Sequence, residues 1–582
     1  MTARSVFAGI AQGHVDPAVA IVEDGRVLAY CEEERLVRVK HAPYVYPMQA
    51  LQYCLRTAGV ELSDLAAVAV PHDARAYSDG RMARYFAGVR RRWQVDGATR
   101  SWQRRELATL NTDALTALHH RTWRAAFAAE PLPPVVGVPH HLAHAYLATQ
   151  QSGFERSVCL TVDGSGDHHC TVVWHHDGEG LTPIREIRIP HSLGWFYAAI
   201  TEYLGFQAYD GEYKVMGLAA YGRQDGDLAA RLGQVVRPAP DGIEYRLDPR
   251  FIHYGRHSYS DRYTDDLVEL LGRPPRRPGD EMQGWHEDVA FAAQDLLERS
   301  VERLLAWALA ETGERDVCVC GGVGLNVKLN MRLAGVPGVR RLFPHPLCAD
   351  SGLAAGAPLL LAGVRPRPLS TLALGPDPGD AEQVLRAVGA AYRRVPDVCR
   401  HVANLLCRGQ VVAWVQGRLE AGPRALGQRS ILADPRSVAM RDRVNAIVKH
   451  REYWRPFCPS LPEEAAETYL GSAARAPFMI TAMPAGDRLR EEAPAIVHVD
   501  GTVRPQTVSR EVLPRYHRLL VEFGRLSGVP VLLNTSLNVS GEPIVASVED
   551  ALRTFWSTGI DALVVDDLVV TKEGAQAEGG PR

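Results

Sequence analysis

Residues 139–167 read PHHLAHAYLATQQSGFERSVCLTVDGSGD, and this stretch decides the fold. It predicts a helix carrying His140 and His144, then an apolar strand over residues 158–162 that ends at Asp163 in a Gly-Ser-Gly turn. Residues four apart lie on one helical face, so both imidazoles can reach one ion, and a carboxylate at the strand end can supply a third ligand. A bare HxxxH pair is more often two ordinary surface and core histidines. The strand and glycine turn directly behind this pair favour a cation held beside a phosphate.

The strand pattern around this stretch occurs twice in the chain. Residues 5–34 predict a strand, a turn, a second strand, a Glu-Asp-Gly turn and a third strand, and residues 157–188 repeat that plan. Each meander is followed by helices. The repetition predicts a duplicated α/β domain with a ligand held between its halves, which is the architecture of the actin, sugar-kinase and Hsp70 nucleotide-binding fold.

Size and composition limit the remaining possibilities. A chain of 582 residues is too long for one core and predicts about two to four domains. A formal net charge of -3 provides no field for holding nucleic acid non-specifically. The N-terminus lacks the pattern of a secretion signal, and no apolar run reaches about 18 to 20 residues, so we expect a soluble cytoplasmic protein without membrane contact. The 10 cysteines form no CxxC pair, which argues against zinc-ribbon and disulfide frameworks.

Three further motifs lie between the first meander and residue 362. Residues 81–105 interleave arginines with aromatic residues, a pattern that can clamp a nucleotide or RNA but is more often the solvated face of an inserted helical pair. Residues 317–330, VCVCGGVGLNVKLN, predict a buried strand, a glycine turn that can approach an anion or adenosine, and a helix opening near Asn326; tight packing explains such a turn equally well. Asp350 precedes a small-residue helix, where it is either an N-cap or a further metal ligand.

Residues 362–380 are rich in Pro and Gly and predict a linker, so a second domain begins near residue 372. Its signature is positive charge beside glycine. Guanidinium groups bind phosphate in a bidentate manner, so an anion-binding pocket is one interpretation, and surface salt bridges are the other; the cations are Arg418, Arg424, Arg429, Lys449, Arg451 and Arg455. A later strand is followed by neutral polar groups suited to an amide or ribose, namely Asn534, Thr535, Ser536 and Asn538.

Taken together, the motifs resemble one enzyme family. HHLAHA, VDGSGD, GEYKVMGLAAYG (residues 211–222), CGGVGLNVKLN, DSGLAAGA, EAGPRALGQRSILADPR, KHREYWRPFCPS and LNTSLN are similar, in order and spacing, to motifs of the NodU/CmcH O-carbamoyltransferases. The resemblance implies an actin-like (ASKHA) carbamoyl-transfer domain over residues 1–370, similar to the metal-dependent transferase of the tRNA threonylcarbamoyladenosine pathway. It implies a YrdC-like α/β domain over residues 371–582.

The resemblance also implies a reaction and a set of site residues. The YrdC-like domain would make carbamoyl-adenylate from carbamoyl phosphate and ATP with Mg²⁺, and the first domain would pass the carbamoyl group to a hydroxyl. The implied metal ligands, for Fe²⁺ or else Mn²⁺ or Zn²⁺, are His140, His144, Asp163 and Asp350. The residues implied to lie against the adenylate are Gly164, Gly321, Gly322 and Asn326. Those implied to bind carbamoyl phosphate and ATP are Arg418, Lys449, Arg451, Arg455, Asn534 and Ser536.

The acceptor hydroxyl needs a general base, and here the chain departs from the family pattern. Members typically place a histidine where this sequence has Val15, within Gly13-His14-Val15-Asp16-Pro17. Either His14 reaches in from one position earlier, or Asp16 or another residue acts. On the acceptor side we single out Lys40, His41 and Lys214.

Three functions stay open from the sequence. The first is carbamoyl transfer to a small-molecule hydroxyl, such as a sugar hydroxyl of a glycosylated antibiotic or macrolide, by a monomer or dimer. The second is tRNA modification on the same fold, against which the near-neutral net charge counts. The third is an actin-like ATP-binding regulator without transfer chemistry, which leaves the cationic motifs of the second domain unexplained.

Overall fold

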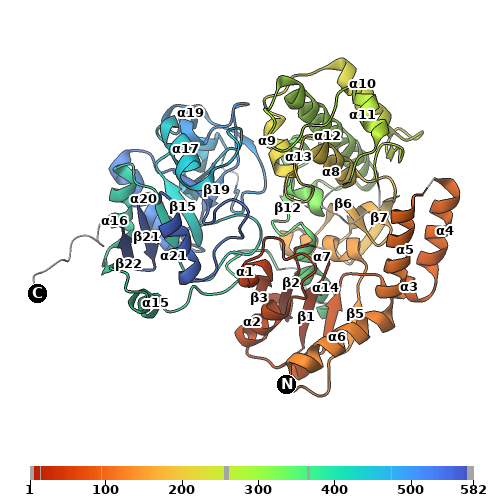
Figure 1. Cartoon of the computed structure of the whole chain (residues 1–582), viewed down its shortest axis with the longest axis horizontal. Coiled ribbons are helices and arrows are strands. Elements are labelled where there is room, and N and C mark those ends of the chain that lie inside the picture. The colour runs from red at the N-terminus through yellow and green to blue at the C-terminus, as the bar shows by residue number, and fades with distance from the viewer. Residues whose placement is uncertain are drawn as a thin grey trace, which may run out of the picture. The chain divides into compact units, whose positions relative to one another are not determined.

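The computed structural model describes residues 5–13, 15–93, 95–253, 261–363, 367–472 and 475–572. The chain divides into two units (Figure 1). The first comprises Met1–Tyr30 and Tyr44–Leu369, and the second comprises Cys31–Pro43 and Ser370–Arg582. A short segment near the N-terminus therefore groups with the C-terminal part of the chain. Among the described residues, no helix combines the length and the apolar character needed to cross a bilayer.

The first unit contains two five-stranded sheets with the same plan. One sheet has the order β3-β2-β1-β4-β5, and the other has β12-β11-β6-β7-β8. In each, an antiparallel meander is extended by two parallel strands on the side of its first strand. The strands are β1 (Val6–Ala11), β2 (Ala18–Glu23), β3 (Arg26–Glu32), β4 (Ala67–Val70), β5 (Val135–Gly137), β6 (Ser157–Gly166), β7 (His169–His176), β8 (Leu181–Arg188), β11 (Asp316–Cys320) and β12 (Arg341–Pro344). The duplicated α/β architecture expected from the sequence is confirmed.

Two helices pack against these sheets, and glycines set how closely they approach. Helix α14 (Leu353–Ala362) packs on β1 and β2 and against α7 (His140–Ser152), which in turn packs on β6 and β11. A Cβ at Gly356 would lie 2.2 Å from the Ala143 carbonyl oxygen, and one at Gly9 would lie 2.0 Å from that of Ala354. Only glycine permits such close backbone contact. The helix that carries the histidine pair is thereby held close to α14, and α14 is held close to β1 of the first sheet.

The remaining helices of the first unit cover the sheets and form the insertions. The arginine-rich run folds as the expected helical pair, α4 (Arg81–Arg92) and α5 (Gly97–Thr109), and the long run near residue 300 forms α12 (Gly284–Thr312). The other helices and the small β9-β10 ribbon are α2 (Met48–Ala58), α3 (Ala74–Ser78), α6 (Thr112–Ala126), α8 (Leu193–Tyr203), α9 (Glu212–Leu218), α10 (Gly226–Val235), β9 (Val236–Pro238), β10 (Tyr245–Leu247), α11 (Asp265–Leu271) and α13 (Val327–Ala334).

The second unit is built on an eight-stranded mixed sheet with the order β13-β22-β21-β14-β15-β20-β16-β19. Its strands are β13 (Arg393–Arg394), β14 (Val412–Val415), β15 (Arg429–Ala433), β16 (Cys458–Pro462), β19 (Gln506–Val508), β20 (Leu532–Ser536), β21 (Ala562–Val565) and β22 (Leu568–Thr571). Smaller pieces are α1 (Glu34–Val37), β17 (Met483–Pro484) and β18 (Thr502–Val503). The part of the chain expected to be a linker is held in place at its end, because Ala421 N–H donates to the Leu372 carbonyl and Gly375 N–H donates to that of Leu419.

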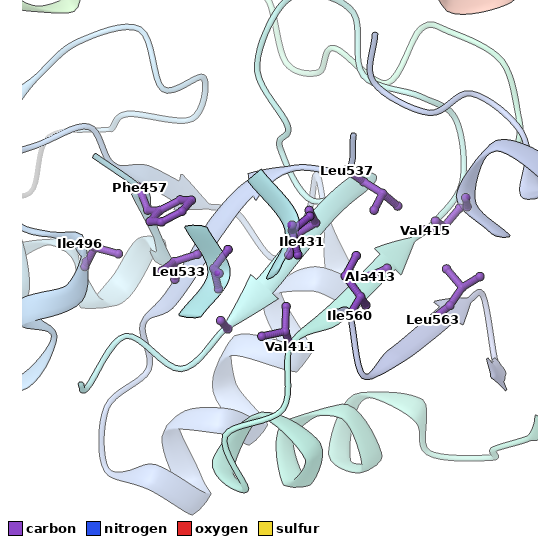
Figure 2. Close-up of a cluster of buried hydrophobic side chains, with 14 of the residues drawn as sticks. Val411, Ala413, Val415, Ile431, Phe457, Ile496, Leu533, Leu537, Ile560 and Leu563 are labelled. Atoms are coloured by element: carbon purple, nitrogen blue, oxygen red, sulfur yellow. The ribbon is translucent and has the colours of Figure 1, made fainter. Parts of the chain in front are cut away.

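Successive side chains along a strand of this sheet point to opposite faces and pack into two separate hydrophobic cores. Ala413 and Val415 enter the core that Figure 2 shows with Ile431 and Leu533. Val412 and Trp414 enter the opposite core. That second core includes α16 (Val398–Cys407) and α20 (Pro514–Ser527), while the first includes α15 (Ala381–Ala387), α17 (Val438–Val444), α18 (Ala466–Leu470), α19 (Asp487–Glu492) and α21 (Val548–Ser557).

Candidate functional site

Two imidazoles and two carboxylates converge in the first unit. Helix α7 supplies His140 and His144, β6 supplies Asp163, and Asp350 begins the 3-10 helix Asp350–Gly352. One ligand atom from each lies within 4.8 Å of all the others. The His144 Nε2 atom is 3.1 Å from Asp163 Oδ2 and 3.7 Å from Asp350 Oδ1. His140 Nε2 is 3.5 Å from Asp163 Oδ2 and 3.6 Å from Asp350 Oδ1. The four residues expected to ligate a metal are thus brought together.

The electrostatics of this cluster suit a cation. Burial lowers the pKa of His144, but the Asp163 and Asp350 carboxylates, which accept hydrogen bonds from the protonated ring, outweigh burial and raise the pKa to about 9. Burial raises the pKa of Asp163, yet His140 and His144 hold it well below its usual range. Among the described residues, His140 Nε2 has no hydrogen-bond partner although it is buried. A divalent ion fits this donor set, because mixed imidazole and carboxylate ligands are those of iron, manganese and zinc.

Residues around the ligands fix their orientation, as outer contacts of metal sites usually do. The Cys320 Sγ atom lies 3.4 Å from His144 Nδ1. The Asp167 carboxylate accepts hydrogen bonds from the backbone N–H groups of His140 and Asp73. Sequence reasoning missed both residues. Asp167 is the last residue of the VDGSGD motif, and that position could have indicated its role. For Cys320 the sequence indicates only that it lies in a buried strand.

One sequence prediction at this site is wrong, and one of the two roles left open for Asp350 is excluded. The strand does not end at Asp163: β6 continues to Gly166 through a bulge, and the turn follows at residues 167–168. A bulge adds a residue without ending the ladder and redirects the side chains beside it. Asp350 is not an N-cap, since the capping position is Ala349 and no side-chain cap bond forms. Its carboxylate instead faces the two histidines.

The middle histidine of HHLAHA has a different role. His141 Nδ1 is 2.9 Å from Thr161 Oγ1, and its Nε2 is 3.1 Å from the His169 carbonyl oxygen. Both ring nitrogens are therefore occupied by β6 and β7. His141 ties the helix to the sheet, while the outer two histidines face the carboxylates.

The glycines expected to lie against an adenylate are close to the metal cluster. A Cβ at Gly322 would lie 3.1 Å from Asp163 Oδ1, and one at Gly164 would lie 3.0 Å from Trp195 Nε1. Gly321 has a φ of 87° and approaches the Val162 carbonyl, so packing between β11 and β6 already requires glycine there. Asn326 caps α13 through Leu329 N–H and pairs with Gln294.

The residues expected at the chemical step are only partly described. His14 lies outside the described residues. Asp16 adopts a φ of 52° in the loop between β1 and β2. Lys214, in α9, places its ammonium 5.5 Å from the centroid of the Phe206 ring.

In the second unit, a buried ammonium lies within a ring of oxygens. Lys449 ends a π-helical turn, Asn445–Lys449, and its Nζ is 2.6 Å from the Ser536 carbonyl oxygen and 2.8 Å from Asn538 Oδ1. Burial first, and then Arg451 and Arg455, hold the pKa of Lys449 well below its usual range. The structure therefore joins two residues named for the carbamoyl phosphate and ATP site, Lys449 and Ser536, by a hydrogen bond and brings two arginines near them.

The other polar residues named for this domain have separate partners. Arg418 donates to the carbonyls of Leu374 and Gly375. Asn534 is buried and donates to the Ala425 carbonyl and Ser460 Oγ. Arg429 is fully buried and donates to main-chain carbonyls, including that of Gly417 at 2.9 Å. For Arg429 the sequence left an anion pocket and a surface salt bridge open. The side chain is instead buried and holds the loops around β15 together through their carbonyls.

The segment Cys31–Pro43 carries two residues expected on the acceptor side. Lys40 Nζ is 3.4 Å from Glu34 Oε2, and the His41 N–H donates to the same oxygen. Within the second unit, Arg38 donates to the carbonyls of Pro543 and Ile544 and pairs with Asp550. Its neighbour Glu32 accepts a 2.7 Å hydrogen bond from Gly422 N–H.

Comparison with known families accounts for both units. A profile described as carbamoyltransferase N-terminus matches residues 7–359, and one described as carbamoyltransferase C-terminus matches residues 403–572. The chain belongs to the carbamoyltransferase family. The family expected from the motifs is confirmed, and the protein is a carbamoyltransferase.

Relatives of this carbamoyltransferase extend over nearly the whole chain. It is 37% identical to nodulation protein NolNO of Sinorhizobium fredii, over 97% of this chain and 80% of that protein. It is 34% identical to the uncharacterized protein sll1178 of Synechocystis, over 97% of this chain and 96% of that protein. Component A of (R)-2-hydroxyglutaryl-CoA dehydratase of Acidaminococcus fermentans superimposes with a TM-score of 0.33 at 13% identity, over 62% of this chain and 99% of that one.

Proposed function

We propose that this carbamoyltransferase is ATP-dependent and acts on a hydroxyl of a small molecule. In the first step, water hydrolyses carbamoyl phosphate to carbamate and phosphate. A carbamate oxygen then attacks the α-phosphorus of ATP, and the bond from that phosphorus to the pyrophosphate oxygen breaks. The products are carbamoyl-adenylate, phosphate and pyrophosphate. In the second step, the acceptor oxygen attacks the carbamoyl carbon, the bond from that carbon to the AMP oxygen breaks, and AMP leaves.

The convergence of His140, His144, Asp163 and Asp350 is the observation that supports the proposal most directly. A divalent ion held by these residues would neutralise charge on the adenylate phosphate or polarise the carbonyl. The residues themselves preorganise the site before substrate arrives, and that preorganisation is the main source of electrostatic catalysis. A side chain at residue 322 would crowd Asp163 Oδ1, since its Cβ would lie 3.1 Å away.

We assign the adenylate-forming step to the second unit, as a YrdC-like domain with Mg²⁺ and ATP. Lys449, Arg451 and Arg455 concentrate positive charge next to the oxygen-rich loop of Ser536 and Asn538. Guanidinium and ammonium groups in such proximity suit a polyphosphate. Exchanging phosphate for AMP also gives the first unit a larger leaving group on which to use binding energy.

For the proton of the acceptor hydroxyl, we keep two candidates from the loop between β1 and β2. They are His14 and Asp16. A His14→Ala variant that transfers the carbamoyl group at the wild-type rate would remove His14 from the mechanism. The same measurement on Asp16→Asn then decides the second candidate.

The decisive experiment measures AMP formation from ATP by the purified protein. We expect AMP only when carbamoyl phosphate and a divalent metal are both present. Equal AMP formation without carbamoyl phosphate would refute the proposal. Binding of unmodified tRNA with carbamoylation of the RNA would replace the small-molecule acceptor by a nucleic acid, against the net charge of -3.

A further inference from the structure

Helix α12 carries a buried amide in its apolar face. Gln294 is 5% exposed and stands among the alanines and leucines of that face, and α12 packs on α8 and α13 (Figure 1). Burying an amide costs free energy unless its polar atoms are hydrogen-bonded. Gln294 therefore needs partners on the neighbouring elements.

The amide of Gln294 uses all four of its hydrogen-bonding positions. Its Nε2 donates to Glu298 Oε1 at 2.7 Å and to Asn326 Oδ1 at 2.9 Å. Its Oε1 accepts from the Tyr197 hydroxyl at 2.7 Å and from Asn326 Nδ2 at 2.9 Å. A buried amide that is bonded at every position is held in one orientation.

Glu298 decides which way round the two paired amides lie. A carboxylate only accepts hydrogen bonds, so Gln294 must turn its NH₂ group, and not its oxygen, toward Glu298. Asn326 must then present its oxygen to Gln294 Nε2 and its NH₂ group to Gln294 Oε1. The second oxygen of Glu298 lies 3.3 Å from a guanidinium nitrogen of Arg332, which belongs to α13. The contacts thus close a ring between α12 and α13.

This ring ends at the glycine turn beside the metal cluster. Asn326 Oδ1 also accepts from Leu329 N–H at 3.0 Å and so caps α13, and the Asn326 N–H donates to the Val323 carbonyl at 3.0 Å. In the same turn, a Cβ at Gly322 would lie 3.1 Å from Asp163 Oδ1. Asn326 therefore fixes one end of the turn, and a candidate metal ligand borders the other.

We propose that Gln294 is a positioning residue for the nucleotide, because it fixes Asn326 and, through Asn326, the glycine turn of residues 321–325 against which the adenylate lies. The inference rests on the proposed function for the adenylate. Glycine turns at the start of a helix bind phosphate through main-chain N–H groups, and such groups are effective only when they are held in place. Gln294 touches no substrate and acts through Asn326.

Exchanging two side chains of α12 tests the inference without changing their size or the net charge. In the combined variant Gln294→Glu with Glu298→Gln, the carboxylate at residue 294 no longer donates to Asn326 Oδ1. Asn326 then turns its NH₂ group toward that carboxylate, and the cap on Leu329 N–H is lost. Calorimetric titration of the full-length protein with AMP in the presence of Mn²⁺ measures the affinity. We expect the combined variant to bind AMP at least tenfold more weakly than the wild type.

Asp295→Asn is the matched control on the same helix. Asp295 pairs with Arg332, as Glu298 does, but in the part of the chain that the structure describes it accepts no hydrogen bond from Gln294 or Asn326. This variant should bind AMP as the wild type does. Gln294→Met, which has a similar length and no amide, is the second test and should also lose at least tenfold in AMP affinity.

Binding of Mn²⁺ separates positioning of the nucleotide from a general loss of structure. The four candidate metal ligands lie on other elements than α12 and α13, so both Gln294 variants should bind Mn²⁺ with wild-type affinity. Undiminished AMP binding by both variants would overturn the inference. So would an equal loss in Asp295→Asn, or a parallel loss of Mn²⁺ affinity.

The AMP assay of the proposed function is read separately on the wild type. AMP binding that depends on Gln294, without AMP formation that depends on carbamoyl phosphate, would retain the positioning role and refute the proposed function. AMP formation that depends on carbamoyl phosphate, with AMP binding indifferent to Gln294, would refute only the positioning role.

Discussion

Gly166 and His140 share one small space, because a methyl group at Gly166 would lie 2.1 Å from Cδ2 and 2.3 Å from Cγ of the His140 ring. The glycine stands in β6 three residues after Asp163, where the bulge brings the strand against the start of α7. The last glycine of VDGSGD is thus the residue that lets the first histidine of HHLAHA face the carboxylates.

Gly166→Ala should therefore displace His140 and weaken metal binding by at least about tenfold. Overpacking of this kind costs about 1–3 kcal/mol of stability. Equilibrium dialysis against Fe²⁺ or Mn²⁺ measures the affinity, and thermal unfolding measures the stability. Gly180→Ala is the control, since nothing lies within 4 Å of a Cβ there. Wild-type metal affinity in Gly166→Ala would contradict the role assigned to His140.

Asp350→Ala should remove most metal binding without destabilising the fold. The Asp350 side chain is 50% exposed, so its loss leaves no buried cavity, while one of the four candidate ligand atoms disappears. Metal content after dialysis, measured by mass spectrometry, should fall well below one ion per chain, with an unchanged unfolding midpoint. Glu311→Gln removes an exposed carboxylate at the end of α12 and should retain the metal.

Cys320→Ala should reduce metal affinity by about tenfold while leaving the four candidate ligands in place. Groups that contact the other ring nitrogen of a ligating histidine typically change metal affinity by a factor of about 10 to 100. The thiol lies against His144 Nδ1 and so holds the orientation of the ring. Cys318→Ala, two residues earlier in β11, is the comparison, since its Sγ contacts Ser157 and Ala148 instead. Equal losses in the two variants would indicate a general packing effect.

Lys449→Met should abolish AMP formation but leave metal binding in the first unit unchanged. In the contacts described for Lys449, the Nζ atom alone donates hydrogen bonds to the oxygens of Ser536 and Asn538. Methionine has no such donor. Arg525→Ala removes a cation from an exposed pair with Glu522 and serves as the control. If Lys449→Met still forms AMP at the wild-type rate, the adenylate step lies elsewhere.

Glu106 gives the stability a pH dependence that can be measured near neutrality. Burial is the main cause that raises the pKa of Glu106 from 4.5 to about 7. Arg105 lowers this pKa and Asp167 raises it further. A carboxyl with a raised folded-state pKa binds more protons when folded, so its contribution is complete below about pH 4.5 and is lost as pH rises through about 7. At pH 8 the free energy of unfolding of Glu106→Gln should therefore exceed that of the wild type by on the order of 1 kcal/mol, with a higher unfolding temperature. Near pH 5 the two proteins should unfold at the same temperature.

The sequence predicted the parts of the site that depend on local patterns. The i, i+4 spacing placed His140 and His144 on one helical face, and the repeated meanders predicted both sheets of the first unit. Asp350, which is distant in sequence, lies with the other three residues named as ligands. Contacts across elements could not be predicted, because the register between β11, β6 and α7 decides that Cys320 meets His144. The same limitation concealed the burial of Arg429, since charge beside glycine normally indicates the surface.

The grouping of Cys31–Pro43 with Ser370–Arg582 has a practical consequence for dissecting the enzyme. A fragment that begins at residue 370 lacks Arg38, so Asp550 and the carbonyls of residues 543–544 lose their partner. It also lacks Glu32, which accepts the hydrogen bond from Gly422 N–H. Unsatisfied buried polar groups of this kind favour insolubility or misfolding. Autonomous expression of the C-terminal half therefore calls for a peptide spanning residues 31–43, supplied in trans or fused through a linker.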